Sequence, residues 1–283
     1  MKILKKMLIT LLIIAAFVFL AFSINEKLNQ KVFVTEYTFC HSELPTPFEG
    51  YRIMVISDLH EAPFSQQIIH HINVENPDII VFTGDMVQLP DSSIEETKKI
   101  AAAAGDIPMY AVSGNHDTQC GDYDGVIAEL WECGIRPLEN DGTRIIKENE
   151  VMYLIGVKDP VHDVVTKEHT DQMCSAIEKN LPEEKNFAVL LCHRADLYPQ
   201  IKDAGADLIL SGHLHGGIIR LPFVGGLLGR EVDEKHFFPE YDYGYIKEGN
   251  FAAMIVSGGC DKNSDKKRYF NPPEVVLITL EGE

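Results

Sequence analysis

The sequence predicts a layered α/β domain behind an apolar N-terminal segment, and three observations lead to this prediction. Short, β-branched apolar runs recur along the chain and end abruptly in polar residues, which is typical of strands buried on both faces. Helix-like stretches separate several of these runs, and alternating strands and helices indicate a layered α/β fold. The last strands lack helical spacers. A mixed sheet or a two-sheet sandwich therefore fits better than a purely parallel sheet.

The N-terminal segment has the composition of a membrane anchor. Three lysines precede an uncharged apolar run over residues 7–24, which is close to the shortest length that spans a bilayer. A signal peptide cleaved after Ala21-Phe22-Ser23 is the alternative. We expect residues 1–6 in the cytoplasm, a transmembrane anchor over 7–24, a linker over 25–30 and a catalytic domain over 31–283. The leading lysines favour a single-pass cell-membrane protein with its catalytic domain outside the cytoplasm.

Composition limits the possible partners. The chain of 283 residues is 45% hydrophobic and carries a formal net charge of −18. A duplex nucleic-acid binder usually has a basic face, so we expect no nucleic-acid partner. Six cysteines are present without a CxxC pair, which makes a cysteine-based zinc site improbable and leaves any disulfide pairing open.

The elements follow in order after the anchor. A strand is expected over residues 31–39, and two prolines and a glycine interrupt the next segment. The apolar runs predict further strands over residues 52–57, 78–84, 109–114, 151–157, 187–192, 207–212, 251–256 and 274–280. The intervening stretches predict helices over residues 64–75, 94–104, 123–133 and 171–179. The carboxyl ends of these strands are the expected place for chemistry in such folds.

Polar residues that bind metals gather at these strand ends. Five of the 11 histidines lie there, mixed with carboxylates and one amide. Mixed imidazole and oxygen ligands suit Mn, Fe or Zn, and their number exceeds what one ion needs. The candidate set is Asp58 and His60 in SDLH, Asp85 in FTGD, Asn115, His116 and Asp117 in SGNHD, His193 in LCHR, and His213 and His215 in SGHLHGG.

This series of motifs resembles the calcineurin-like metallophosphoesterases, and GHLHGGIIRLPFVGG behind a membrane segment resembles their membrane-anchored bacterial subgroup. The resemblance covers roughly residues 31–283. It implies a four-layer α/β/β/α sandwich of mixed sheets with a two-metal site. By motif, the first metal would be bound by Asp58, His60 and His215, and the second by Asn115, His193 and His213, with Asp85 bridging both. Gln88 and Ile218 depart from residues that are frequent in the family, so substrate contacts are expected to differ.

The implied activity is hydrolysis of phosphate mono- or diesters by two-metal activation of a bridging water. His116 would donate a proton or bind the phosphoryl group, and Asp117 would orient it. Arg194 and Arg220 adjoin the ligand loops and are candidate substrate contacts. The substrate is expected to be a phosphoester, possibly lipid-linked.

Two alternatives stay open. One is a pyrophosphatase that acts on a lipid-linked nucleotide sugar such as UDP-2,3-diacylglucosamine, and the other is a non-catalytic metal-binding membrane module. The long irregular stretch over residues 216–250 is interpreted as a wall of the site. Its residues Leu221, Phe223, Leu227 and Leu228 either contact lipid or pack on the sandwich, and we expect packing.

Overall fold

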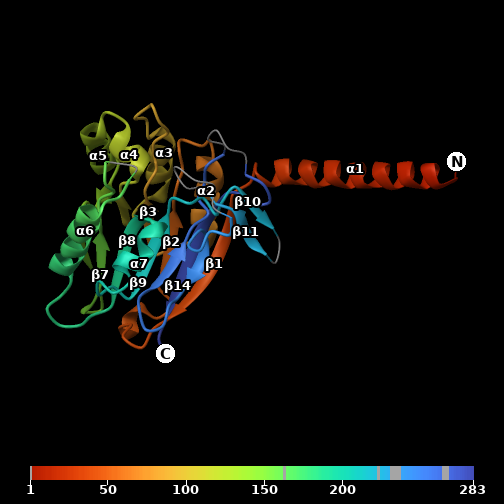
Figure 1. Cartoon of the computed structure of the whole chain (residues 1–283). Coiled ribbons are helices and arrows are strands. Elements are labelled where there is room, and N and C mark those ends of the chain that lie inside the picture. The colour runs from red at the N-terminus through yellow and green to blue at the C-terminus, as the bar shows by residue number, and fades with distance from the viewer. Residues whose placement is uncertain (1, 162–163, 222–223, 230–236, 263–267) are drawn as a thin grey trace.

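Two mixed six-stranded sheets form the centre of the computed structural model, which describes residues 2–161, 164–221, 224–229, 237–262 and 268–283 (Figure 1). The first sheet has the order β1 (Phe33–Cys40), β14 (Glu274–Glu281), β2 (Arg52–Ile56), β3 (Ile79–Thr83), β4 (Met109–Val112) and β5 (Ile135–Pro137). The second has the order β12 (Gly244–Ile246), β13 (Ala253–Val256), β9 (Leu208–Gly212), β8 (Ala188–Arg194), β7 (Glu150–Gly156) and β6 (Asp141–Lys147). Both contain parallel and antiparallel pairs.

Helices cover the outer face of each sheet. The first sheet carries α2 (Ser65–Glu75), α3 (Glu95–Ala104) and α5 (Tyr123–Glu132), and the second carries α6 (Lys167–Asn180) and α7 (Tyr198–Ile201). A short helix, α4 (Asn115–Gln119), follows β4. The four-layer sandwich of mixed sheets expected from the sequence is confirmed.

Side chains along the central strands point alternately to the covering helices and to the other sheet, which produces the packed layers. In β2, Met54 packs toward α2 and α3, while Ile53 and Val55 face the other sheet. In β8, Val189 and Leu191 face the first sheet and Leu190 faces α6. Because successive strand side chains point to opposite faces, a run that is apolar at every position is buried on both.

The apolar N-terminal run forms one helix, α1 (Lys2–Leu28), which projects away from the sandwich (Figure 1). It is long and apolar enough to cross a membrane, and its apolar stretch is not buried in the protein. The helix continues to Leu28, so most of the expected linker over 25–30 is helical. Asn25 within it is 1% exposed, because it packs against the catalytic domain.

A two-stranded hairpin stands apart from the sandwich. Its strands are β10 (Ile219–Leu221) and β11 (Gly225–Leu228). This pair lies inside the stretch that the sequence left irregular. Leu221, Leu227 and Leu228 are half-buried there, in keeping with the expected packing, and Phe223 lies outside the described residues. All six cysteines lie within the described residues, and none is paired.

Candidate active site

The candidate ligands meet at the carboxyl ends of strands from both sheets. Asp58 and His60 follow β2, Asp85 follows β3 and Asn115 follows β4, all in the first sheet. The other three histidines come from the second sheet, with His193 in β8 and His213 and His215 in the loop after β9. Five of the seven residues have a positive φ, namely Asp58 (49°), His60 (46°), Asp85 (55°), His213 (74°) and His215 (51°). This conformation is uncommon outside glycine and clusters at functional sites.

One group of side chains contains Asp58, His60, Asp85 and His215, each with a donor atom within 4.8 Å of the others. His60 Nε2 lies 3.5 Å from Asp85 Oδ2, and His215 Nε2 lies 3.4 Å from Asp58 Oδ1. The His60 and His215 rings are stacked with centroids 5.1 Å apart. Four ligand atoms of this kind could surround a single divalent ion.

A second group contains Asp85, His193 and His213. His193 Nε2 lies 3.4 Å from Asp85 Oδ2 and 3.3 Å from Asn115 Oδ1. His213 approaches the same nitrogen with its Nδ1, at 3.1 Å. Asp85 belongs to both groups through one oxygen, Oδ2. All seven residues that are candidate metal ligands therefore lie close together.

The far nitrogens of three rings are oriented by neighbouring oxygens. His60 Nδ1 lies 3.1 Å from Val87 O, and His193 Nδ1 lies 2.7 Å from Thr83 O. His215 Nδ1 lies 3.1 Å from the carboxylate of Asp261. Such partners fix the tautomer and the ring direction of metal-binding histidines. Asp261 was not among the residues that the sequence motifs indicated.

Glycines allow the ligand loops to approach one another. Gly84 has φ +93°, and a Cβ placed there would lie 2.6 Å from His193 Nδ1. An alanine would therefore be strained in its backbone and would also collide with a candidate ligand.

The charges buried in this site shift the pKa values of its histidines. Burial lowers the pKa of His60 to about 4. Burial alone would also lower the pKa of His193, but the carboxylates around it, Asp85 foremost with Asp58 and Asp159, together raise that pKa to about 10. The pKa of Asp85 is lowered well below its usual range by His193 and His60, although burial opposes this, so a positive charge on His193 would balance part of the buried negative charge. His60 Nε2 is buried without a hydrogen-bond partner among the described residues. A nitrogen in that position costs free energy unless a ligand is bound.

The donor set therefore fits divalent metal ions. It offers imidazole nitrogens and carboxylate oxygens, an orphaned buried nitrogen that points into the cluster, and far-side oxygens that orient the rings. His60 and Asp261 line a cavity of about 300 Å³. Its other walls include Glu61, Gln88 and Lys262.

His116 lies at the rim, and its ring packs against His60 with centroids 4.4 Å apart. Burial lowers its pKa. The amide nitrogen of Leu89 lies 3.5 Å from His116 Nδ1, which favours the tautomer with its hydrogen on Nε2.

The expected contact between Asp117 and His116 is wrong. Asp117 Oδ2 accepts hydrogen bonds from the amides of Asp85 and Gly114, both at 2.8 Å, and Oδ1 accepts one from Val87 at 3.0 Å. Its carboxylate therefore ties the Asp85 loop to the Gly114 turn. Asp117 supports the position of Asp85 rather than the ring of His116.

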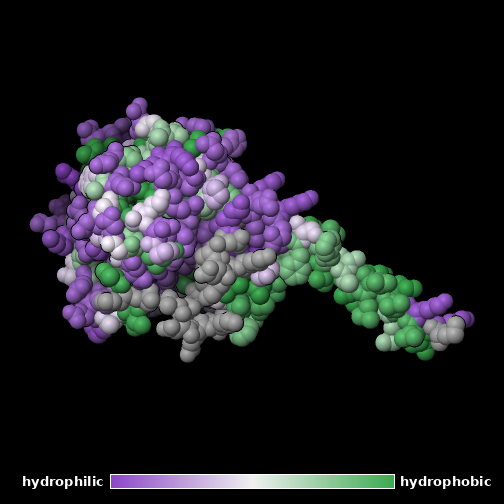
Figure 2. Space-filling view, turned by 90° about the horizontal axis from the view of Figure 1, so that it is seen from above, coloured by the Kyte–Doolittle hydropathy of each residue, from purple (hydrophilic) through white to green (hydrophobic). Residues whose placement is uncertain are grey.

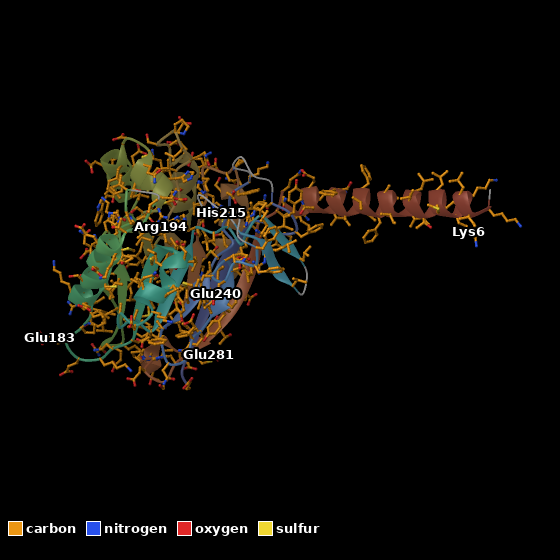
Figure 3. The ribbon with its side chains drawn as sticks, viewed as in Figure 1. Lys6, Glu183, Arg194, His215, Glu240 and Glu281 are labelled. Atoms are coloured by element: carbon orange, nitrogen blue, oxygen red, sulfur yellow. The ribbon has the colours of Figure 1, made fainter. Side chains whose placement is uncertain are left out.

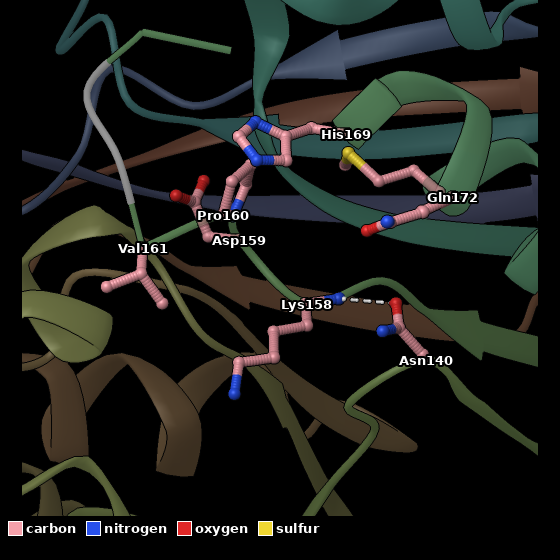
Figure 4. A pocket seen from close by; sticks show the side chains of 8 residues that line it. Asn140, Lys158, Asp159, Pro160, Val161, His169 and Gln172 are labelled. Atoms are coloured by element: carbon pink, nitrogen blue, oxygen red, sulfur yellow. Dashed lines mark hydrogen bonds between the residues drawn. The ribbon is translucent and has the colours of Figure 1, made fainter. Parts of the chain in front are cut away.

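Arg194 was expected to contact the substrate, but it is buried inside the protein instead. It is 2% exposed, and its guanidinium holds the carboxylate of Asp159, with Nε 2.9 Å from Oδ2. Asp159 and Lys158 line a separate cavity of about 260 Å³ near α6, and the Lys158 side chain extends away from Asp159 (Figure 4). Figure 3 shows Arg194 on the α6 side of the rim and His215 toward α1.

Arg220 is also engaged within the protein. Its Nη1 lies 2.9 Å from Asp242 and 3.1 Å from Gly216 O. Its guanidinium carbon lies 4.1 Å from the centre of the Tyr243 ring. Its Nη1 is therefore already committed to partners within the protein.

Comparison with known proteins agrees with this geometry. Residues 51–217, more than half of the chain, match the family described as calcineurin-like phosphoesterase. A metallophosphoesterase of Aquifex aeolicus is 30% identical over 88% of this chain and 92% of its own length. The phosphodiesterase YaeI of Escherichia coli is 32% identical over 66% of this chain and 68% of its own. The UDP-2,3-diacylglucosamine pyrophosphatase LpxG of Chlamydia muridarum is 25% identical over 83% and 86%.

Proposed function

Because the chain belongs to the calcineurin-like phosphoesterases, and is thus a hydrolase of phosphoester bonds, we propose that it cleaves phosphate mono- or diesters with two divalent ions while anchored in a membrane. The observation that carries the two-ion proposal is the position of Asp85 Oδ2, which lies 3.5 Å from His60 Nε2 and 3.4 Å from His193 Nε2. One carboxylate oxygen thus serves two groups of ligand atoms.

Each group would hold one ion of the Mn, Fe or Zn class. Asp58, His60 and His215 would hold the first, and Asn115, His193 and His213 the second, with Asp85 shared. When bound, the ions would activate water toward phosphorus and neutralise charge on the phosphoryl oxygens.

The residues around the ions would position the substrate. His116 presents Nε2–H at the rim, where it would donate to a phosphoryl or leaving-group oxygen. Asp117 would keep Asp85 in place through the backbone of both loops. Lys262, which lines the adjoining cavity, would supply a positive charge for the phosphoester.

A second candidate function is cleavage of the pyrophosphate in a lipid-linked nucleotide sugar. Two observations favour it, namely the similarity to the Chlamydia muridarum pyrophosphatase and the α1 helix that could hold the protein at its lipid. We place the N-terminal lysines in the cytoplasm and the catalytic domain outside it. Digestion of intact cells with a protease tests the side, since an external domain is cut and a cytoplasmic one is protected.

Activity is tested with a simple aryl phosphodiester and Mn²⁺, with and without a chelator. We expect turnover that the chelator abolishes. His116→Ala should lose turnover while it retains its metal content, measured by elemental analysis. Trp131→Ala, at an exposed position on α5, is the matched control and should keep both. Equal turnover in His116→Ala and the unmodified protein would contradict the role of His116.

A further inference from the structure

The end of α1 fixes where a membrane would meet the catalytic domain, provided that α1 is the anchor proposed above. Ile24 is the last residue of its apolar run and is 48% exposed. The next residue, Asn25, is buried and accepts a hydrogen bond from the Phe270 amide at 2.6 Å. It also donates to Arg268 O at 3.1 Å. The apolar helix therefore ends directly on the surface of the domain, without a spacer.

The β10–β11 hairpin is built on the same segment. The Tyr269 amide donates to Ile218 O at 2.9 Å, and the Arg220 amide donates to Tyr269 O at 3.0 Å. The Tyr269 ring in turn contacts Phe22 of α1 edge-on, with centroids 5.8 Å apart. Figure 1 shows the hairpin extending from the sandwich on the side from which α1 leaves it. A bilayer crossed by α1 would thus lie against the hairpin.

Large apolar side chains are exposed around this hairpin. Val224 in its turn is 59% exposed, and Phe237 and Phe238, which pair with the end of β11, are 70% and 63% exposed. We call these three residues the apolar patch. Phe238 has φ 57°, a costly conformation for a bulky residue. Hydrophobic surface lies next to the base of α1 in Figure 2.

The metal cluster lies close to the same boundary. The backbone oxygen of His215 accepts hydrogen bonds from the side chains of Arg268, at 3.2 Å, and Asn271, at 2.6 Å. Arg268 also binds Asp261, with Nη1 2.5 Å from Oδ1. Asp261 is the partner of the His215 ring. Only this short segment separates α1 from a candidate ligand.

We propose that the apolar patch inserts into the membrane interface beside α1, and that the substrate is a phosphoester borne by a membrane lipid. The patch and α1 together hold the domain in one orientation, so that the cluster faces phosphoryl groups at headgroup depth. Insertion depends on apolar burial, because a net charge of −18 would oppose attraction to anionic lipids. The proposal names the substrate class for the phosphoesterase site described above and rests on that function.

Position in the bilayer is tested with the single tryptophan of the chain, Trp131. It lies on α5, at the end of the molecule away from α1 (Figure 1). In nanodiscs that contain brominated phosphatidylcholine, fluorescence of the full-length protein should be unquenched. A W131F/F238W variant should be strongly quenched. If its fluorescence equals that of the same variant in unbrominated nanodiscs, insertion of the patch is refuted, whatever the activity.

Substrate class is tested with two esters that share one leaving group, ethyl and hexadecyl 4-nitrophenyl phosphate, using full-length protein in nanodiscs. We expect kcat/KM to favour the hexadecyl ester at least tenfold. F237S/F238N should reduce this preference severalfold, because asparagine accepts a positive φ while both rings are lost. I146S, at an exposed site on β6, should keep the preference. Equal rates for the two esters would overturn the lipid assignment alone, whereas no hydrolysis of either ester or of 4-nitrophenyl phosphate, a monoester, would overturn the phosphoesterase proposal itself.

Discussion

The two groups of candidate metal ligands are supported by different parts of the molecule. His193 is held in place by the sandwich interior. Its Nδ1 lies within hydrogen-bond distance of Thr83 O in β3, and its neighbour Arg194 forms an ion pair with buried Asp159. His215 is supported by the segment over residues 268–271. The side chains of Arg268 and Asn271 bond to its backbone oxygen, and Asp261, which binds Arg268, contacts its ring. That segment also receives α1. One group is therefore set by the core, and the other is set partly by the N-terminal helix.

The largest effect is expected from replacing Asp85, the residue that belongs to both groups of ligands. Asp85→Asn keeps the size of the side chain but withdraws its negative charge, so both ions should lose a ligand. We expect kcat/KM for an aryl phosphodiester to fall at least about a thousandfold and metal content to fall at both positions. Asp91→Asn, which changes an exposed carboxyl, is the control. Two full metals in Asp85→Asn would disprove the bridging role.

The next variant separates the two groups. Asp261→Asn removes the charged partner of the His215 ring, and such losses typically cost about 10–100-fold in metal affinity. We expect one ion to become weakly bound while the other stays tight, which isothermal titration with Mn²⁺ would resolve as two distinct sites. Equal weakening of both ions would show that the two groups do not depend on separate supports.

A third prediction concerns the pH dependence of the metal-free protein. The pKa of His60 is lowered to about 4 in the fold, against about 6.5 in an unfolded chain. Between these values the unfolded state takes up the proton, so the stability contributed by neutral His60 is present above pH 6.5 and is lost as the pH falls toward 4. Urea unfolding in EDTA should show a loss of about 1–3 kcal/mol from this group between pH 7 and 5. His60→Gln should reduce the slope, and an unchanged slope would contradict it.

The smallest expected effect comes from the helix contact. Asn25→Ala leaves the Phe270 amide and part of the bonding of Arg268 O unsatisfied, at a cost of about 1–3 kcal/mol in the local segment. Because the segment supports His215 only indirectly, we expect a fall of a few fold in affinity for the first ion. Asn29→Ala, at a half-buried position with one bond to Arg268 O, should have a smaller effect. No change in metal affinity for Asn25→Ala would show that α1 does not contribute to the site.

Strand-end patterns in the sequence predicted a layered α/β fold with polar residues gathered at one rim, and the family resemblance supplied the four layers. The run over residues 79–82 is apolar at every position, which requires burial on both faces, and the polar residues that follow it must then emerge at the rim. Asp261 follows β13 and two glycines in the same manner. Asp261 lies five residues past the end of β13, within the loop where such polar residues are expected.

Other features depend on contacts that spacing does not encode. The sequence places Asp117 beside His116, but helix α4 turns its carboxylate toward three backbone amides. Arg194 follows a ligand directly, yet strand alternation buries it against Asp159. Asn25 looks like the start of a linker, because nothing local indicates its partner more than 240 residues away.

The direct junction between α1 and the domain has a consequence for how the protein would find its substrate. A flexible tether would let the catalytic unit tumble and sample the aqueous volume above its membrane. If α1 is the proposed membrane anchor, its continuation into the fold removes that freedom, and encounters with the proposed lipid-borne substrate would depend on lateral diffusion of protein and lipid within one plane.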